Sequence, residues 1–163
     1  MACIYCTPEW FEESAKLYRE TPRFHEAFKK LSTAIFYRIY QEPTWGFERD
    51  FIFGAIVDKG NLLELRFYNE QETKENAEFL LSATPQEWKL ILTKAHKFLT
   101  DFMLNKIKLE QGSKVGILGL APYADTFIEA LTQVKLTFQD DLSPEQLADY
   151  RIYAAEFRER LGI

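Results

Sequence analysis

The chain has 163 residues, of which 47% are hydrophobic, so it is long enough for one domain with a substantial core. Its formal net charge is −5 and its pI is about 5.2, which argues against a nucleic-acid-binding protein with a basic face. No run of about 18 apolar residues is present, so we expect no transmembrane segment, and we expect a cytoplasmic location because the start does not resemble a signal peptide.

Aromatic residues are abundant, with 14 Phe, 8 Tyr and 3 Trp. Because these side chains bury large areas with few rotatable bonds, their number predicts either a large core or a cavity lined with rings.

Two cysteines, Cys3 and Cys6, stand close to the start of the chain. A redox pair would normally follow a strand, and a zinc site would need further ligands that the two distant histidines do not supply at motif spacing. A frayed terminus or simple packing is therefore favoured over an accidental disulfide, and no metal or cofactor is expected.

Helix starts recur as a hydroxyl residue followed by proline, at residues 7–8, 21–22, 84–85 and 143–144. The hydroxyl can cap the helix, and proline lacks the backbone donor that the first turn leaves unpaired. Thr84 and Glu87 further match a capping box. Helical spacing of apolar residues follows each start, with a break expected near His96 and an irregular beginning to the helix after Gly112.

Between the early and middle helices the apolar period changes to two, which predicts strands. These cover residues 33–40, 51–57, 62–68, 77–82 and 107–110, with a hairpin turn at residues 58–61 and a polar loop at 70–76. Strands clustered in this way predict the α+β class, with a mostly antiparallel five-stranded sheet and helices on one face. We expect one domain at residues 1–142 and a helical extension packed on it at 143–163.

Residues 77–112 carry a resemblance. The runs A-E-F-L-L-S-A-T-P-Q-E-W-K-L-I-L and F-L-T-D-F-M-L-N-K-I-K-L-E-Q-G resemble the sterol carrier protein type 2 family of non-specific lipid-transfer domains. The family's helix-end and short-strand segment is matched at Met103, Asn105, Lys106, Ile107, Lys108, Leu109 and Gly112. The opening P-E-W-F-E-E-S-A-K-L-Y is similar to the leading helix of prokaryotic single-domain relatives, and the likeness covers residues 8–135.

Two departures stand out. Asn105 occupies the family's usual glycine position, where asparagine tolerates the left-handed conformation, and Gln111 adds one residue before Gly112.

The resemblance implies non-catalytic binding of an apolar, lipid-like ligand, such as a fatty acid, acyl-CoA, sterol or isoprenoid, in a tunnel between sheet and helices. A tunnel needs an apolar lining without unpaired buried charge. The expected lining comprises Phe79, Leu81, Trp88, Leu92, Phe98, Phe102, Met103, Val115, Leu118, Phe127, Ile128 and Leu131. Each of these residues can equally be ordinary core.

A basic cluster lies within this acidic protein, at Lys94, His96, Lys97, Lys106, Lys108 and Lys114. It predicts attraction of an anionic ligand headgroup or transient contact with a membrane surface, and a solvated face is the alternative. No nucleic-acid partner is expected.

Two other functions stay open. The first is a protein-interaction module that keeps the fold with its tunnel plugged by side chains. In that case the final helix covers the tunnel mouth or forms a homodimer through Leu147, Tyr150, Ala154 and Phe157. The second is an enzyme, which would need His96 with Asp101 or Glu87 inside the tunnel. No nucleophile lies at motif spacing from His96, so no catalytic residue is assigned.

Overall fold

The structure is a computed structural model that describes residues 2–163. Helices and strands alternate in the order β1 (Ala2–Ile4), α1 (Pro8–Glu20), α2 (Pro22–Ala27), β2 (Ser32–Ile39), β3 (Phe51–Asp58), β4 (Asn61–Phe67), α3 (Glu70–Asn76), β5 (Phe79–Ala83), α4 (Pro85–Leu92), α5 (Phe98–Met103), β6 (Lys108–Gln111), α6 (Lys114–Leu120), α7 (Ala124–Leu131), β7 (Lys135–Thr137) and α8 (Pro144–Leu161). Short 3-10 turns lie at Pro43–Trp45, Ala121–Tyr123 and Gln139–Asp141. No helix within residues 2–163 is both long and apolar enough to cross a membrane.

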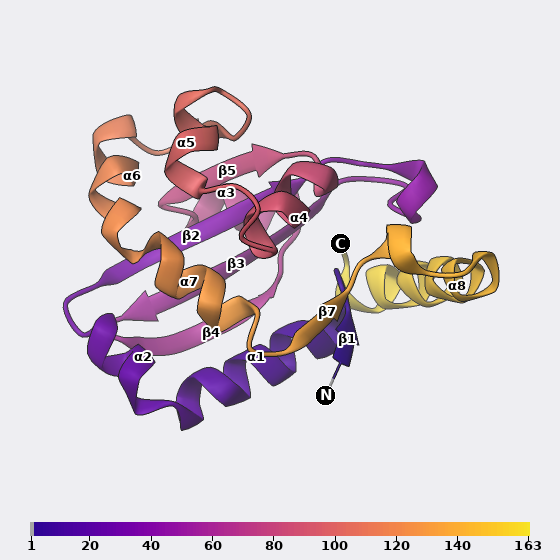
Figure 1. The fold of residues 1–163 in the computed structure, drawn as a ribbon, viewed down its shortest axis with the longest axis horizontal. Coiled ribbons are helices and arrows are strands. Elements are labelled where there is room, and N and C mark those ends of the chain that lie inside the picture. Colours follow the sequence, from indigo (N-terminus) through magenta and orange to yellow (C-terminus); the bar gives the residue numbers. More distant parts are fainter. Residues whose placement is uncertain (1) are drawn as a thin grey trace.

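The main sheet has five strands in the order β4-β3-β2-β5-β6 (Figure 1). All neighbouring strands are antiparallel except β2 and β5, which run parallel and place Ile35 opposite Phe79. This confirms the α+β class and the mostly antiparallel five-stranded sheet predicted from the period-two segments.

Most of the helices cover one face of this sheet, and Figure 1 shows α7 crossing in front of the strands. α1 packs on the same face through Phe11, whose ring centroid lies 5.0 Å from that of Phe53 and 4.7 Å from that of Phe67. The opposite face carries a smaller buried cluster of Phe36, Ile52, Tyr68, Ala77 and Leu80. The large core therefore lies between the sheet and the helices, where the strand alternation sends half of each strand's side chains.

Residues 70–76 form a helix, so the expectation of a polar loop there was wrong. α3 begins with a capping box. The Asn69 side chain accepts from the Glu72 backbone N–H at 2.8 Å, and the Glu72 side chain accepts from the Asn69 backbone N–H at 3.1 Å. Of its own residues only Thr73 is buried, so the helix lacks the apolar stripe by which helices are found in a sequence.

The proline-marked helices begin where the sequence predicts, but their hydroxyls act differently. Thr84 and Ser143 cap their helices by accepting a backbone N–H three residues on, whereas Thr7 and Thr21 make no such bond. The capping box expected at Thr84 is only half formed, because the Glu87 side chain does not return to the backbone of Thr84.

The first residues pair with a late segment instead of fraying. β1 runs parallel to β7, with Cys3 opposite Leu136, and makes a second, two-stranded sheet that the sequence did not predict. Cys3 and Cys6 are buried free thiols, which agrees with a packing role. Burial raises the pKa of the Cys6 thiol well above its ordinary value and keeps it protonated.

The last helix, α8, packs on the end of the molecule that also carries both termini (Figure 1). The ring of Phe157 stacks on those of Phe51 and Phe67, with centroids 5.9 and 5.6 Å apart. The Arg158 guanidinium lies 3.6 Å from the ring centroid of Phe51 and donates to the Arg49 carbonyl at 2.7 Å.

Of the four α8 side chains considered for a dimer, Tyr150, Ala154 and Phe157 are buried against the rest of the chain. The Tyr150 hydroxyl donates to the Cys6 carbonyl at 2.8 Å. The oligomeric state and the division at residue 142 stay predictions.

Candidate apolar ligand site

An apolar cavity of about 50 Å³ lies between the main sheet and the helices that cover it. Its lining combines strand, helix and N-terminal residues: Tyr5, Ile35, Tyr37, Phe53, Leu81, Trp88, Ile91, Leu92, Phe98, Ile117, Leu120, Ala124, Phe127, Ile128 and Leu131. Among these described lining residues none carries a carboxylate, an imidazole or a thiol, and the phenols of Tyr5 and Tyr37 are the titratable groups of the lining.

The floor of the cavity is the sheet. Ile35 and Tyr37 on β2, Phe53 on β3 and Leu81 on β5 all point to the helix-covered face because alternate residues of a strand share a side. Tyr37 stacks on Phe53 with ring centroids 4.9 Å apart. Two of these four floor residues carry rings, which hold their shape better than flexible aliphatic chains.

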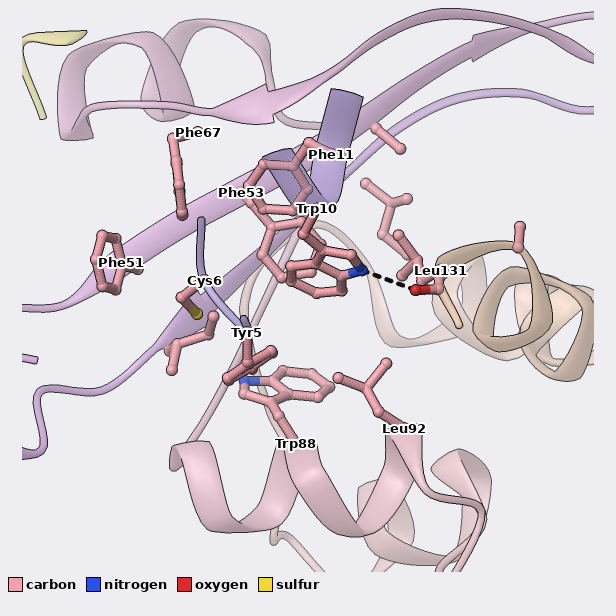
Figure 2. Packing of buried hydrophobic residues seen from close by; sticks show 14 of the residues in the cluster. Tyr5, Cys6, Trp10, Phe11, Phe51, Phe53, Phe67, Trp88, Leu92 and Leu131 are labelled. Carbon is pink, nitrogen blue, oxygen red and sulfur yellow. Dashed lines mark hydrogen bonds between the residues drawn. The ribbon is translucent and has the colours of Figure 1, made fainter. Parts of the chain in front are cut away.

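One wall is α4, from which Trp88 and Leu92 point toward Tyr5 (Figure 2). The indole N–H of Trp88 donates to the Arg38 carbonyl at 2.9 Å, and its ring meets Tyr37 edge-on at 5.6 Å. The hydrogen bond satisfies the one polar atom of the indole and fixes the ring against the end of β2.

The outer wall is formed by α6, the 3-10 turn at Ala121–Tyr123, and α7. Ile117 and Leu131 are buried, whereas Leu120, Phe127 and Ile128 are only partly buried. A wall with few fully buried side chains opens at lower cost than the rest of the core. The irregular beginning expected for the helix after Gly112 is not found, because Lys114–Leu120 is a regular helix, and the irregular turn follows it at Ala121–Tyr123.

A second cavity, of about 30 Å³, lies beside the first, under α1 and β4. Tyr37, Phe53, Phe127 and Leu131 line both cavities and therefore form the partition between them. Ligand pockets usually enclose about 300–1,000 Å³, so the two cavities together are much smaller than a lipid site in use. A long apolar ligand would need the partition or the outer wall to move.

Two buried hydroxyls give this apolar interior polar points. Tyr5 lines the first cavity and Ser14 the second, and both hydroxyls are buried. Burial, with a smaller contribution from the neighbouring Cys6 thiol, raises the pKa of Tyr5 well above its ordinary value, so its hydroxyl remains a donor. Sulfur is a weak acceptor, and a ligand oxygen would be a stronger partner for this donor than the Cys6 thiol.

Seven of the twelve side chains expected to line a tunnel are brought together around the first cavity: Leu81, Trp88, Leu92, Phe98, Phe127, Ile128 and Leu131. Phe79 and Phe102 are buried in the core outside its lining. The ring of Phe79 lies against Gly112 and Gly116, where a Cβ atom would come within 2.5 and 2.7 Å of it.

The other three, Met103, Val115 and Leu118, lie on the surface with 55%, 82% and 38% of their area exposed. They occupy the outward faces of α5 and α6, and none lines either cavity.

The sequence interpretation omitted Tyr5, Ile35, Tyr37, Phe53, Ile91, Ile117, Leu120 and Ala124 from the lining. Strand alternation carries the signal for Ile35, Tyr37 and Phe53, since each lies two or four residues from another inward residue. No local signal identifies Tyr5, which reaches the cavity only because β1 pairs with β7.

A polar cluster of Glu87, His96 and Asp101 lies outside the cavity. His96 Nδ1 is 2.7 Å from Asp101 Oδ2 and 3.6 Å from Glu87 Oε2, and each residue offers one atom within 4.8 Å of the others, a spacing that could hold a metal ion. The direct bond between imidazole and carboxylate ties the loop after α4 to α5.

The two carboxyl groups of this cluster differ in their pKa. Burial and the neighbouring Asp101 raise the pKa of Glu87. Burial acts to raise the pKa of Asp101 too, but Glu87 and His96 outweigh it and hold that pKa below its ordinary value. The cluster therefore moves the pKa values of its two carboxyl groups in opposite directions, as expected for two acids that share a site.

No protein-family model matches the chain, and no curated protein matches it in sequence. Its fold matches solved structures. One is a conserved hypothetical protein of Thermus thermophilus that has been suggested to be a sterol carrier protein. It is 18% identical with a TM-score of 0.68, and the match covers 80% of this chain and 90% of that one. A crystal structure of sterol carrier protein 2 is 20% identical with a TM-score of 0.62, and the match covers 77% and 92%.

The apo form of sterol carrier protein 2 from Yarrowia lipolytica is 10% identical, with a TM-score of 0.52 and coverage of 76% and 87%. These matches confirm the resemblance at the level of the fold.

Proposed function

We propose that this chain, which has the sterol carrier protein fold, is a non-catalytic carrier that binds an apolar, lipid-like ligand between its sheet and its helices. The observation that carries the proposal is the predominantly apolar cavity between the strands β2, β3 and β5 and the helices α4 to α7, whose outer wall includes several partly buried side chains. Support also comes from the names of its structural neighbours, which are called sterol carrier proteins.

Ligand uptake requires the interior to enlarge. Movement of α6 and α7 away from the sheet would separate Phe127 and Leu131 from Tyr37 and Phe53, and would join the two cavities. A chain of about 16 carbons gains about 12 kcal/mol from burial, and association costs of about 4–15 kcal/mol offset much of this gain. The cost of opening lowers the affinity further, so micromolar binding with little selectivity is expected.

Tyr5 is the proposed polar contact for a ligand oxygen, because it lines the cavity and its buried hydroxyl has only the weakly accepting Cys6 thiol beside it. Leu81, Trp88, Leu92, Phe98, Phe127, Ile128 and Leu131 are the proposed apolar contacts. Phe79 and Phe102 support this lining from behind.

The test is titration with a fluorescent fatty acid. Ala124→Trp places a large ring at the cavity and should abolish probe uptake, whereas Ala155→Trp on the exposed side of α8 should leave uptake unchanged. Thermal unfolding of both variants shows whether the fold is retained. Unchanged uptake by a folded Ala124→Trp variant would place the ligand elsewhere.

A second candidate function is a protein-interaction module whose interior is permanently filled. It is favoured by the small volumes of the two cavities, about 50 and 30 Å³. The same titration separates the two functions, because a filled interior takes up no fatty acid, acyl-CoA or sterol at any concentration at which the probe remains soluble.

A further inference from the structure

Exposed apolar side chains gather on one part of the surface. Of the eight large hydrophobic side chains exposed in residues 2–163, five lie between positions 99 and 118: Leu99, Met103, Leu104, Val115 and Leu118. The other three, Leu63, Ile152 and Leu161, are scattered over β4 and α8. We call the five clustered side chains the α5–α6 patch.

α5 and α6 lie at the same end of the molecule, opposite α8 (Figure 1). Their inward residues, Phe98 and Ile117, line the same cavity, so both helices border it. The opposite faces of the helices expose the patch, with Val115 82% and Leu104 60% exposed. Exposed apolar side chains gathered at one end of a folded protein mark an interaction site more often than scattered ones do.

Lysines border the patch. Lys97 precedes α5, Lys106 lies in the turn after it, and Lys114 begins α6, and all three are exposed. Within the described chain none of them lies within ion-pair distance of a carboxylate. Lys108 does not belong to this border. Leu81 faces the cavity, so its neighbour Ser82 faces the other side of the sheet, and Lys108, which pairs with Ser82, faces that side too.

Acidic residues are scarce in this region, although the protein carries 25 of them and a net charge of −5. Between residues 94 and 118 only Asp101 and Glu110 occur. Asp101 is buried against His96, and Glu110 accepts from Arg38 at 2.8 Å on the far face. Asp125 and Glu129 lie in a shallow pocket with Lys94 and Lys97, where Glu129 is already paired with Arg23.

We propose that the α5–α6 patch docks on an anionic phospholipid membrane, with its apolar side chains inserted at the headgroup boundary and Lys97, Lys106 and Lys114 at the lipid phosphates. Stable attachment at a membrane surface needs both signals, apolar insertion and basic charge. The patch and its border combine exposed apolar side chains and lysines on α5 and α6, which both contribute to the cavity lining. The inference extends the proposed carrier function, because docking would bring the wall of the cavity to the lipid.

The test is co-flotation with two kinds of vesicle, phosphatidylcholine alone and phosphatidylcholine mixed with phosphatidylglycerol. We expect binding to the mixed vesicles, weakened by salt because the phosphate contacts are screened. The double change Met103→Glu with Val115→Glu should weaken binding at least about tenfold. Changing the three border lysines to Gln should weaken it about 100-fold.

The matched control is the double change Leu63→Glu with Ile152→Glu, which adds the same two charges at exposed apolar positions outside the patch. It should bind the mixed vesicles nearly as the unchanged protein does. Because all these positions are exposed, the variants should fold, and circular dichroism with thermal unfolding verifies it.

Two results would overturn the proposal: no binding to either vesicle, or equal binding by the patch variants and the control. A dimer in solution that Met103→Glu converts to monomer would assign the patch to a second copy of the chain and would also overturn it. Uptake of a fluorescent fatty acid without vesicles is measured in parallel, so failure of docking and failure of the carrier function are separate outcomes.

Discussion

Removing the ring of Phe127 tests the partition between the two cavities. Phe127 is partly buried, lines both cavities, and stacks on Phe28 with ring centroids 4.6 Å apart. Truncating a fully buried Phe to Ala costs about 3–5 kcal/mol. Because this ring is only partly buried, we expect Phe127→Ala to lower the free energy of unfolding by about 2 kcal/mol, and the melting temperature by about 4–8 °C.

The same change should leave fatty-acid affinity equal or higher, because the ligand no longer has to displace the ring to connect the cavities. Thermal unfolding with and without a saturating fatty acid measures both effects, since a ligand at 100 times its Kd adds about 2.7 kcal/mol of stability. The control is Tyr153→Ala, which removes a partly buried ring from α8, away from the cavities. It should lower stability without altering affinity.

A tenfold loss of affinity in a folded Phe127→Ala variant would refute this reasoning. It would show that the contact between this ring and the ligand contributes more to affinity than displacing the ring costs.

Three further predictions concern other parts of the structure. Trp88→Phe should remove most of the change in tryptophan emission on fatty-acid binding, whereas Trp45→Phe should not, because only Trp88 lines the cavity. Arg158→Ala should lower the free energy of unfolding, measured by chemical denaturation, by about 2–4 kcal/mol, because the charged hydrogen bond to the Arg49 carbonyl and the stacking on Phe51 are lost. Fatty-acid affinity should not change, because these contacts lie away from the cavity. The unchanged protein should lose stability as pH rises above about 4.3, because Glu87 gives up its proton, and Glu87→Gln should not show this loss. Denaturation at a series of pH values measures the difference.

The sign of the Glu87 effect follows from the raised pKa of that carboxyl group. The folded state holds its proton more tightly than the unfolded chain, so its contribution is full below the unfolded pKa and is lost as pH rises through the folded one. Asp101 acts oppositely, because its pKa is lowered, and its contribution is lost as pH falls. If the stability of a Glu87→Gln variant depends on pH as that of the unchanged protein does, the raised pKa of Glu87 beside Asp101 would be contradicted.

The other two predictions have equally direct contradictions. Equal emission changes in the Trp88→Phe and Trp45→Phe variants would place the ligand away from α4. A drop in fatty-acid affinity in Arg158→Ala would show that α8 communicates with the cavity.

Much of the fold can be predicted from the sequence, because its signals are local. The period-two segments located the strands of the main sheet, and the hydroxyl–proline pairs located the starts of α1, α2, α4 and α8. Asn105 has φ of 61°, the left-handed conformation expected where asparagine replaces glycine. The pairing of β1 with β7 could not be predicted, because three-residue strands more than 100 positions apart leave no periodic pattern.

The candidate site was harder to predict than the fold. A helical stripe shows which residues share a face but does not say which face turns inward, so Val115 and Leu118 were placed on the wrong side of α6 while Ile117 was omitted. Glu87 matched a capping box, yet its side chain lies with His96 and Asp101 because tertiary contacts outweigh a local bond.

Native mass spectrometry of freshly purified protein, followed by solvent extraction and lipid analysis, tests the carrier function most directly. The account predicts a discrete added mass on the 19.2 kDa chain that extracts as a fatty acid, sterol or related lipid. A bare chain that takes up no fatty acid, acyl-CoA or sterol when challenged would contradict it and would favour the filled interaction module.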